Sequence, residues 1–568
     1  MDMPNAAIAD SSPKMAPLPA KQRIEALDVI RGFALIGICI MNVEFFNRAQ
    51  GDLGGGIPAG VTGIDWWASW FSNYFVAGKF WTIFSLLFGM GFAVMFGRAS
   101  EAGRSFILPY ARRIAALAVF GALHHILIWP GDILFSYAVG AVILLFTLFG
   151  TWKTILGSML ALLALAFAIK VPSVSTYAVG LGIGGLVALY LRYERLFTRF
   201  KLPLFSLILL VVACGVMLAM LASWFVPDMK GARFPLSVFS FITIMASWLS
   251  VKYYQPVNQR AWRIGLALFL LPPTIGLHFV TPKYFFPELT APAPASRATP
   301  APVPTSNVSA SATAKASAKA SAKASSKTEK TPDQAAERAE RAKERKAEIK
   351  EEIAVIKRGS YIEAVKLRAK SFLKKMPEQG VFGAILLGMF LLGTGFVRSG
   401  VMHDTRAHLP LFRKLAFVAL PLGLLLSIGS SMLATTHELG VPSPAWDLAS
   451  VLLQLSSVPV CLGYVGVLIL MLHGTGPAAK VSLLAPFGRM ALTHYLLQSI
   501  IASAVFYYYG LGFFGVGRAW QFGFVAVLIP CQIVFSHWWL SRYRYGPMEW
   551  LWRAITYWNL PPMRHGTA

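Results

Sequence analysis

Long apolar stretches recur along this chain, and they restrict its fold more than any other feature. Each stretch is close to the 17–25 residues that a helix needs to cross a bilayer. The chain is 56% hydrophobic and only 14% charged, whereas a soluble protein carries about 25% charged residues. The sequence therefore predicts an all-α fold, a polytopic bundle of transmembrane helices.

About 14 spans are expected from the length of the apolar stretches. They are predicted at residues 29–46, 79–97, 114–130, 132–150, 153–170, 174–191, 202–226, 235–251, 262–281, 380–397, 411–435, 446–472, 487–509 and 519–540. The divisions within 114–191 are the hardest to place, because the stretches there follow one another closely.

Basic residues collect in alternate loops, all on one side of the membrane if 14 spans are counted. Because Lys and Arg mark cytoplasmic loops, both termini of this multi-pass protein are predicted to be cytoplasmic. The net charge of +26 is then explained by topology and by contact with anionic lipid headgroups. Membrane lipids are expected partners, and nucleic acid is not.

Four segments have a different composition from the spans. A polar tail at 1–22 and a low-complexity Ala/Lys/Pro and charged tether at 282–345 have little apolar surface to bury and are expected to be disordered, at least in part. An amphipathic helical segment is predicted at 346–379, and a short tail at 559–568. The tether is expected on the outer side, where it either stays solvated or recruits envelope partners.

The stretch "ARRIAALAVFGALHHILIWPGDILF", residues 111–135, carries ionisable groups inside a predicted hairpin of two spans. Arg113 and His124 are eleven residues, about 16 Å, apart along a helix. His124, His125 and Asp132 would lie in the outer half of the bilayer. Charged groups within a membrane mark functional sites by default, and an imidazole near a carboxylate suits a general base. The alternative is a His–Asp hydrogen bond that only locks the hairpin.

The first span, "RIEALDVIRGFALIGICIMNVEFF", carries Asp28, Arg31 and Asn42 near one helical face. Arg31 at the inner mouth of a polar cavity would suit a phosphate group. The alternative is an Asp28–Arg31 pair that merely anchors the end of the helix.

Near the C-terminus, "PFGRMALTHYLLQSII" contains His494 and Gln498. They contact a substrate on the functional interpretation, or form hydrogen bonds between helices on the structural one. The following "RYRYGPMEWLWRAITYWN" is typical of an amphipathic helix at the headgroups. No phosphate loop or metal-ligand motif is found, and the four cysteines are read as small buried hydrophobic residues.

Several pieces together resemble the YeiB-like family of bacterial inner-membrane proteins. They include "RIEALDVIRGFALIGICIMN", "ARRIAALAVFGALHHILIWPGDIL", "LLGMFLLGTGFVRSGV", "GRMALTHYLLQSII" and "GPMEWLWRAITY". The resemblance implies a membrane core of about 10 spans at 23–170 and 380–558. It also implies an insertion of about four spans at 171–281, followed by the tether.

The pattern "LDVIRG" with a later "MN" is also similar to the transmembrane acyltransferase superfamily. That group includes a lysosomal enzyme that acetylates the glucosamine of heparan sulphate from cytosolic acetyl-CoA. The resemblance implies that Arg31 lies near the phosphates of acyl-CoA and Asn42 near the acceptor. Residues 43–78 lack the histidine that the enzyme has after its asparagine, so His124 or His125 would take its place.

The leading hypothesis is therefore an acyl-CoA-dependent acyltransferase acting on a glycan or small-molecule acceptor. In it His125 is the general base, Asp132 orients it, and Arg31 and Arg113 hold phosphate; no metal is required. The rivals are a transporter or channel for a small metabolite and a membrane scaffold. Homo-oligomerisation is left open.

Overall fold

A computed structural model describes residues 24–171, 174–192, 203–226, 229, 232–286, 330–439 and 441–565. The described residues form helices and loops and contain no β-strand beyond two isolated bridges, so the all-α prediction is confirmed. The predicted tail at 1–22, most of the tether and the end of the C-terminal tail lie outside the described residues.

The long helices of the first half of the chain follow the predicted spans closely. They are α1 (Glu25–Asn47), α3 (Phe80–Glu101), α4 (Ile107–Leu123), α5 (Leu134–Phe149), α6 (Trp152–Ala168), α7 (Ser175–Arg192), α8 (Leu204–Phe225), α9 (Arg233–Lys252) and α10 (Arg260–Phe285). A short helix, α2 (Gly63–Phe71), and the turns η2 (Gln50–Asp52), η3 (Ser72–Val76) and η4 (His124–Ile128) connect them.

The second half begins with two helices outside the predicted spans, α13 (Lys330–Arg358) and α14 (Tyr361–Lys375). It continues with α15 (Gln379–Arg398), α16 (Leu409–Lys414), α17 (Leu420–Leu433), α18 (Pro444–Leu472), α19 (Leu484–Arg489), α20 (Ala491–Phe506), α21 (Arg518–Arg542) and α22 (Pro547–Tyr557). Helix α13 begins at Lys330, inside the segment predicted to be a tether.

Ten helical segments of the described chain are long and apolar enough to cross a membrane. Three shorter apolar helices, α5, α6 and α20, and the 18-residue α7 account for the other predicted spans. The chain is thus a multi-pass integral membrane protein. The number of crossings and the side of each terminus stay predictions.

Helices α1, α3 and α15 form the centre of the bundle, and small residues let their backbones approach closely. A Cβ atom on Gly89 of α3 would lie 2.0 Å from the carbonyl oxygen of Phe390 on α15. One on Gly393 of α15 would lie 2.0 Å from the carbonyl oxygen of Leu86. The glycines therefore set the distance between the two helices that form much of the core.

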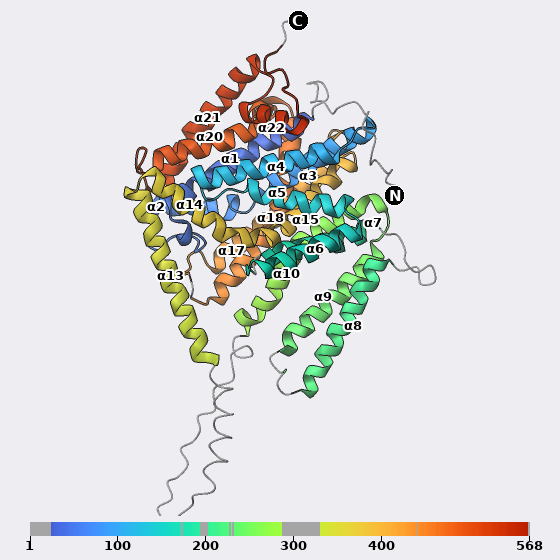
Figure 1. The fold of residues 1–568 in the computed structure, drawn as a ribbon. Coiled ribbons are helices and arrows are strands. Elements are labelled where there is room, and N and C mark those ends of the chain that lie inside the picture. Colours follow the sequence, from blue (N-terminus) through green and yellow to red (C-terminus); the bar gives the residue numbers. More distant parts are fainter. Residues whose placement is uncertain are drawn as a thin grey trace, which may run out of the picture.

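Helices α13 and α14 pack across one end of the bundle, at the left of Figure 1. Arg345 of α13 donates to the carbonyl oxygen of Gly51 at 2.7 Å, and Glu352 accepts the backbone N–H of Gln50 at 3.0 Å. Burial raises the pKa of the Glu352 carboxyl. This end, called the capped end below, is the end at which α1 finishes and the turn η4 lies.

The four spans predicted as one insertion occupy two different environments. Helices α7 and α10 pack against α15 in the core. Helices α8 and α9 pack mainly against each other and stand apart from the bundle in Figure 1. Sequence alone did not distinguish these two pairs, because all four helices are apolar.

Candidate functional site

The predicted hairpin forms as α4, the turn η4 and α5, and it brings a histidine and an aspartate together. The turn at 124–128 is a π-helical turn, closed by the N–H of Trp129 donating to the carbonyl oxygen of His124 at 2.9 Å. Such turns recur at functional sites because they displace side chains from the regular helical positions. Here the turn places both His124 and His125 inside the protein, 2% and 5% exposed.

Asp132 pairs with His124, so the predicted pairing of His125 with Asp132 is wrong. His124 Nδ1 lies 2.8 Å from Asp132 Oδ1. Asp132 Oδ2 accepts the N–H of Phe135 at 3.0 Å, and the hydroxyl of Tyr495 lies 3.4 Å from Oδ1. Adjacent helical residues point about 100° apart, and in this hairpin the first histidine faces the carboxylate.

His125 borders a small cavity on the side of Asp132 nearer the capped end. This histidine cavity has a volume of about 170 Å³. Its lining comprises His125, Pro130, Gly131, Asp132, Phe135, Ser136, Phe372, Lys375, Met376 and Gln379. The His125 ring lies 5.1 Å from the ring of Phe372, a residue of α14. The capping helix therefore contributes part of the wall.

Side chains of α14 hold this helix against the hairpin by hydrogen bonds, mainly to main-chain carbonyl oxygens. Arg368, which is 4% exposed, donates to the carbonyl oxygen of Leu127 at 2.8 Å and to the hydroxyl of Tyr509 at 2.9 Å. Lys375 donates to the carbonyl oxygen of Pro130 at 3.2 Å and also bonds to Gln50. These bonds hold the ammonium group of Lys375 at the edge of the histidine cavity.

A second cavity, of about 230 Å³, lies toward the other end of the bundle and brings together the two predicted phosphate-binding arginines. This arginine cavity is lined by four arginines, one carboxylate, three tyrosines and an apolar wall. The charged and hydroxyl-bearing residues are Arg31, Arg113, Arg489, Arg553, Glu549, Tyr110, Tyr137 and Tyr495. Four guanidinium groups outnumber the Glu549 carboxylate and the Asp28 carboxylate that pairs with Arg31, so the cavity favours an anionic ligand.

Helix α22 forms one wall of the arginine cavity, so it is more than a headgroup anchor. The guanidinium of Arg113 stacks 3.8 Å from the ring centre of Trp552, whose indole N–H donates to the carbonyl oxygen of Arg113 at 2.9 Å. Glu549 accepts the backbone N–H groups of Leu492 and Thr493 at 2.7 and 3.0 Å. This carboxyl caps the start of α20, and burial raises its pKa.

Sequence reasoning did not assign Arg489, Arg553, Glu549 or the tyrosines to the site. Only the tertiary packing brings them together, because they come from five helices, α4, α5, α19, α20 and α22. Two of them have buried polar atoms with no hydrogen-bond partner within the described residues, namely Arg489 Nε and Tyr110 Oη. The one signal in the sequence was an arginine in each segment that resembled the family.

The other predicted site residues are placed as follows. Asp28 and Arg31 form the expected ion pair at 2.6 Å. His494 Nε2 lies 2.6 Å from Ser536 Oγ, and Gln498 donates to Gln532 at 2.9 Å. These bonds join α20 to α21, as the structural interpretation of both residues predicted. Neither residue lines the histidine or the arginine cavity.

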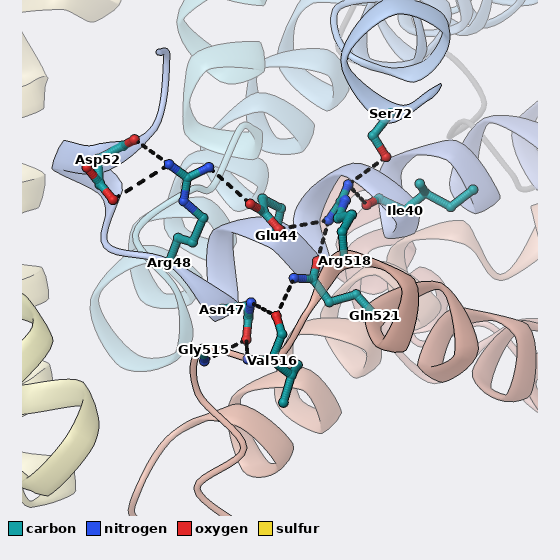
Figure 2. Close-up of polar contacts among 10 residues, drawn as sticks. All are labelled: Ile40, Glu44, Asn47, Arg48, Asp52, Ser72, Gly515, Val516, Arg518 and Gln521. Atoms are coloured by element: carbon teal, nitrogen blue, oxygen red, sulfur yellow. Dashed lines mark hydrogen bonds and ion pairs between the residues drawn. The ribbon is translucent and has the colours of Figure 1, made fainter. Parts of the chain in front are cut away.

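Asn42 lies in α1, half-buried, and its side chain forms no hydrogen bond to another described residue. The asparagine that does form a network is Asn47, one turn further on. Its amide donates to the carbonyl oxygen of Val516 at 2.8 Å and accepts the N–H groups of Gly515 and Val516 (Figure 2). Asn47 thus joins the end of α1 to the loop before α21.

Comparison with known proteins finds relatives without an assigned activity. Residues 396–559 match the family described as "Protein of unknown function (DUF418)". The chain is 24% identical to the uncharacterized protein YxaH of Bacillus subtilis (strain 168), over 97% of this chain and 99% of the relative.

Two partial matches are more similar but shorter. The chain is 32% identical to the uncharacterized protein YeiB of Escherichia coli (strain K12), over 34% of this chain and 50% of that protein. It is 36% identical to an uncharacterized 39.9 kDa protein of Bacillus acidopullulyticus, over 22% of this chain and 34% of that protein. No solved structure matches the chain significantly. The predicted similarity to YeiB is confirmed, and the similarity to the transmembrane acyltransferases stays a prediction.

Proposed function

We propose that this YeiB-like membrane protein is an acyltransferase that moves an acyl group from acyl-CoA to a sugar or another envelope component. One observation carries the proposal. Two cavities approach Asp132 from opposite ends of the bundle, and their chemistry differs. Asp132 itself lines the histidine cavity, and Tyr495, which bonds to it, lines the arginine cavity.

The arginine cavity fits the donor. Phosphate groups are bound well by guanidinium forks, and Arg31, Arg113 and Arg489 provide three of them. Arg489 Nε and Tyr110 Oη are buried and have no partner among the described residues. Because buried polar groups are almost always hydrogen-bonded, we expect both atoms to bond to a polar ligand. The apolar wall of the same cavity suits an acyl chain or the arm that carries it. By the predicted topology this end is cytoplasmic, where acyl-CoA is found.

The reaction needs a base, and His124 suits this role better than His125 because it is bonded to Asp132, although it is His125 that lines the histidine cavity. A carboxylate accepts hydrogen bonds, so Asp132 holds the Nδ1–H of His124 and leaves Nε2 with its lone pair. That Nε2 is buried and has no partner among the described residues. It would take the proton from an acceptor hydroxyl or amine as the acceptor attacks the thioester. The C–S bond then breaks, and the CoA thiolate leaves and takes up a proton.

A transporter for an anionic metabolite is the second candidate, and the same two cavities favour it. The layer formed by His124, Asp132 and Tyr495 separates the two cavities. Such a layer would serve as the barrier in an alternating-access cycle, with the arginine cavity as the binding site.

Binding of acetyl-CoA to the purified protein in detergent tests the donor site. We expect saturable binding that is at least tenfold weaker in Arg31→Ala and Arg113→Ala. The matched control is Arg112→Ala, because Arg112 is adjacent to Arg113 on α4 but does not line the cavity. Equal loss in all three variants, or no binding by the wild type, would contradict the proposal.

The transporter is distinguished by flux. Proteoliposomes loaded with unlabelled acetyl-CoA are expected to accumulate no labelled acetyl-CoA if the protein is an acyltransferase. Exchange across the membrane, lost in Arg113→Ala and kept in Arg112→Ala, would favour the transporter.

A further inference from the structure

A third cavity, larger than the histidine and arginine cavities, lies at the capped end, between the last turns of α1, the α2–η3 segment and the start of α18. It has a volume of about 480 Å³ and shares no lining residue with the histidine or the arginine cavity. We infer that this amide-lined cavity is a binding site for an uncharged carbohydrate. The inference goes beyond the proposed acyl transfer, because it concerns a different cavity and needs no acyl donor.

The charges around the amide-lined cavity are balanced, unlike those of the arginine cavity. Glu44 lies between Arg48 and Arg518, at 3.1 and 3.2 Å, and Arg48 also contacts Asp52 at 3.6 Å (Figure 2). Two guanidinium groups therefore meet two carboxylates. Arg518, which is 6% exposed, also donates to the carbonyl oxygen of Ile40 and to Ser72. No charge is left over to attract an anion.

Side chains that can both donate and accept hydrogen bonds border the same cavity without a protein partner. Asn73 and Gln454 contribute amides, and Ser69 and Ser450 contribute hydroxyls. None of the four side chains is hydrogen-bonded to another residue in the described ranges. Ser69 is buried, Asn73 and Ser450 are half-buried, and Gln454 is exposed. Polar groups that lack a protein partner are normally hydrogen-bonded to water or a ligand. They are expected to face water or a ligand.

The pairing of amides with hydroxyls suits a sugar. Each sugar hydroxyl is a donor and an acceptor, and an amide offers one of each. A carboxylate offers only acceptors, and phosphate offers one or two O–H donors beside its acceptor oxygens, so either would leave most carbonyl lone pairs of Asn73 and Gln454 unpaired. Carbohydrate is therefore a better match to this wall than phosphate or a carboxylate.

Aromatic rings that are held rigidly complete the wall. The indole of Trp446 stacks on His437, with ring centres 5.2 Å apart and planes at 13°. The hydroxyl of Tyr74 donates to the carbonyl oxygen of Ala434 at 2.8 Å, which holds that ring in place. A few polar groups among aromatic surfaces are the usual lining of a small-molecule site, and the flat apolar faces of sugar rings pack on such surfaces.

Two loops, at residues 55–57 and 435–437, bond to each other and form a rim that supports this wall. The N–H of Ile57 donates to the carbonyl oxygen of Thr435 at 2.9 Å, and the N–H of His437 donates to that of Gly55 at 2.9 Å. Gly56 has a φ of +75°. A Cβ atom there would lie 2.4 Å from the Thr435 oxygen and 2.6 Å from the Trp446 ring. Only glycine adopts this φ without strain and leaves room for the Thr435 oxygen and the Trp446 ring. The rim therefore packs directly against the indole.

Calorimetric titration with neutral disaccharides tests the inference on the full-length protein in lipid nanodiscs. Maltoside detergents are avoided, because their own sugar headgroup would compete. The probes are maltose, trehalose and N,N′-diacetylchitobiose, each without acyl-CoA, and then glucose compared with glucose 6-phosphate. We expect saturable binding of at least one disaccharide, and no tighter binding of glucose 6-phosphate than of glucose.

The variants Asn73→Leu and Gln454→Leu are each expected to weaken disaccharide binding about tenfold, because each removes hydrogen bonds worth about 1.4 kcal/mol together. Gln255→Leu, at an exposed position between α9 and α10, is the control and should bind as the wild type does. If Gln454→Leu fails to insert, Gln454→Asn is used instead. It keeps the amide but shortens the side chain by one methylene group, so the amide lies further from the ligand and weaker binding is again expected.

Three results would overturn the inference: no binding of any of the three disaccharides, undiminished binding in the Asn73 and Gln454 variants, or tighter binding of the phosphorylated sugar. Because acyl-CoA is absent from the titration, failure of the proposed acyl transfer leaves this result unchanged.

Discussion

The central helices and the α8–α9 pair are both apolar and helical, yet they use their polar residues in opposite ways. In the most hydrophobic part of α14–α15, 78% of the residues are buried inside the protein, and in α1 67% are. The corresponding values are 11% for α8 and 22% for α9. Among the central helices, α1 contributes Arg31 and Glu44 to cavity walls, and α15 contributes Gln379.

In the α8–α9 pair, the serine and threonine side chains bond to each other's helix or along their own helix, and they line none of the three cavities described above. Ser206 Oγ lies 2.7 Å from Ser250 Oγ, and Ser247 donates to the carbonyl oxygen of Ser206. The comparison teaches that hydropathy identifies membrane helices but does not separate those that build a site from those that face lipid. The following predictions test that division, from the largest expected effect to the smallest.

His124→Ala is expected to have the largest effect on activity. Removing a general base costs about 10²–10⁴-fold in rate, so transfer of a labelled acetyl group should fall by that factor. His125→Ala is the matched neighbour: it lines the histidine cavity but has no carboxylate partner, and a smaller loss is expected. A greater loss in His125→Ala than in His124→Ala would reverse the assignment of the base.

Gly488→Ala is expected to have the largest effect on stability. A Cβ atom there would lie 1.9 Å from the carbonyl oxygen of Asp28, where α19 meets α1. Overpacking of this kind costs about 1–3 kcal/mol or more of the free energy of unfolding. Gly215→Ala, in α8, meets nothing within 4 Å and should change that free energy by less than about 1 kcal/mol.

Thermal unfolding in detergent measures both glycine variants. Similar destabilisation by the two would mean that α8 packs as tightly as α19, and the division drawn above would fail.

Glu549→Gln is expected to change the pH dependence of stability. Burial raises the pKa of this carboxyl above its ordinary value of 4.5. The folded state therefore binds the proton more tightly than the unfolded state does, and its stability falls as the pH rises through the raised pKa. As the pH is lowered from neutrality toward 4.5, the melting temperature of the wild type should rise relative to that of the variant. Parallel curves for the two proteins would contradict this.

Ser250→Ala is expected to have the smallest effect. It removes a hydrogen bond within the α8–α9 pair, and such bonds between membrane helices average about 0.6 kcal/mol. Acetyl transfer and acetyl-CoA binding should stay at the wild-type level. A loss of activity comparable to that of His124→Ala would show that the pair takes part in the site.

Much of the architecture could be predicted from the sequence, because the bilayer imposes a length and a composition on each span. Every predicted stretch coincides with a helix, and the presence of ionisable groups in the hairpin and the first span indicated where chemistry would lie. Arg31 and Arg113 do share a cavity. The assignment of Asp132 to His125 failed, because the partner of a side chain depends on the direction in which a π-helical turn points it.

By itself, the sequence determined that the chain is an all-helical, multi-pass membrane protein with a polar hairpin, because hydropathy and charge act along the chain and need no knowledge of neighbours. Only the tertiary structure decided which polar residues meet. Arg489, Arg553 and Tyr110 join Arg31 in one cavity because α19 packs on α1 and α22 packs on α4. Asn73 and Gln454 border one cavity although they are far apart in the chain. Such meetings depend on side-chain directions and helix distances, which close backbone contacts at small residues set.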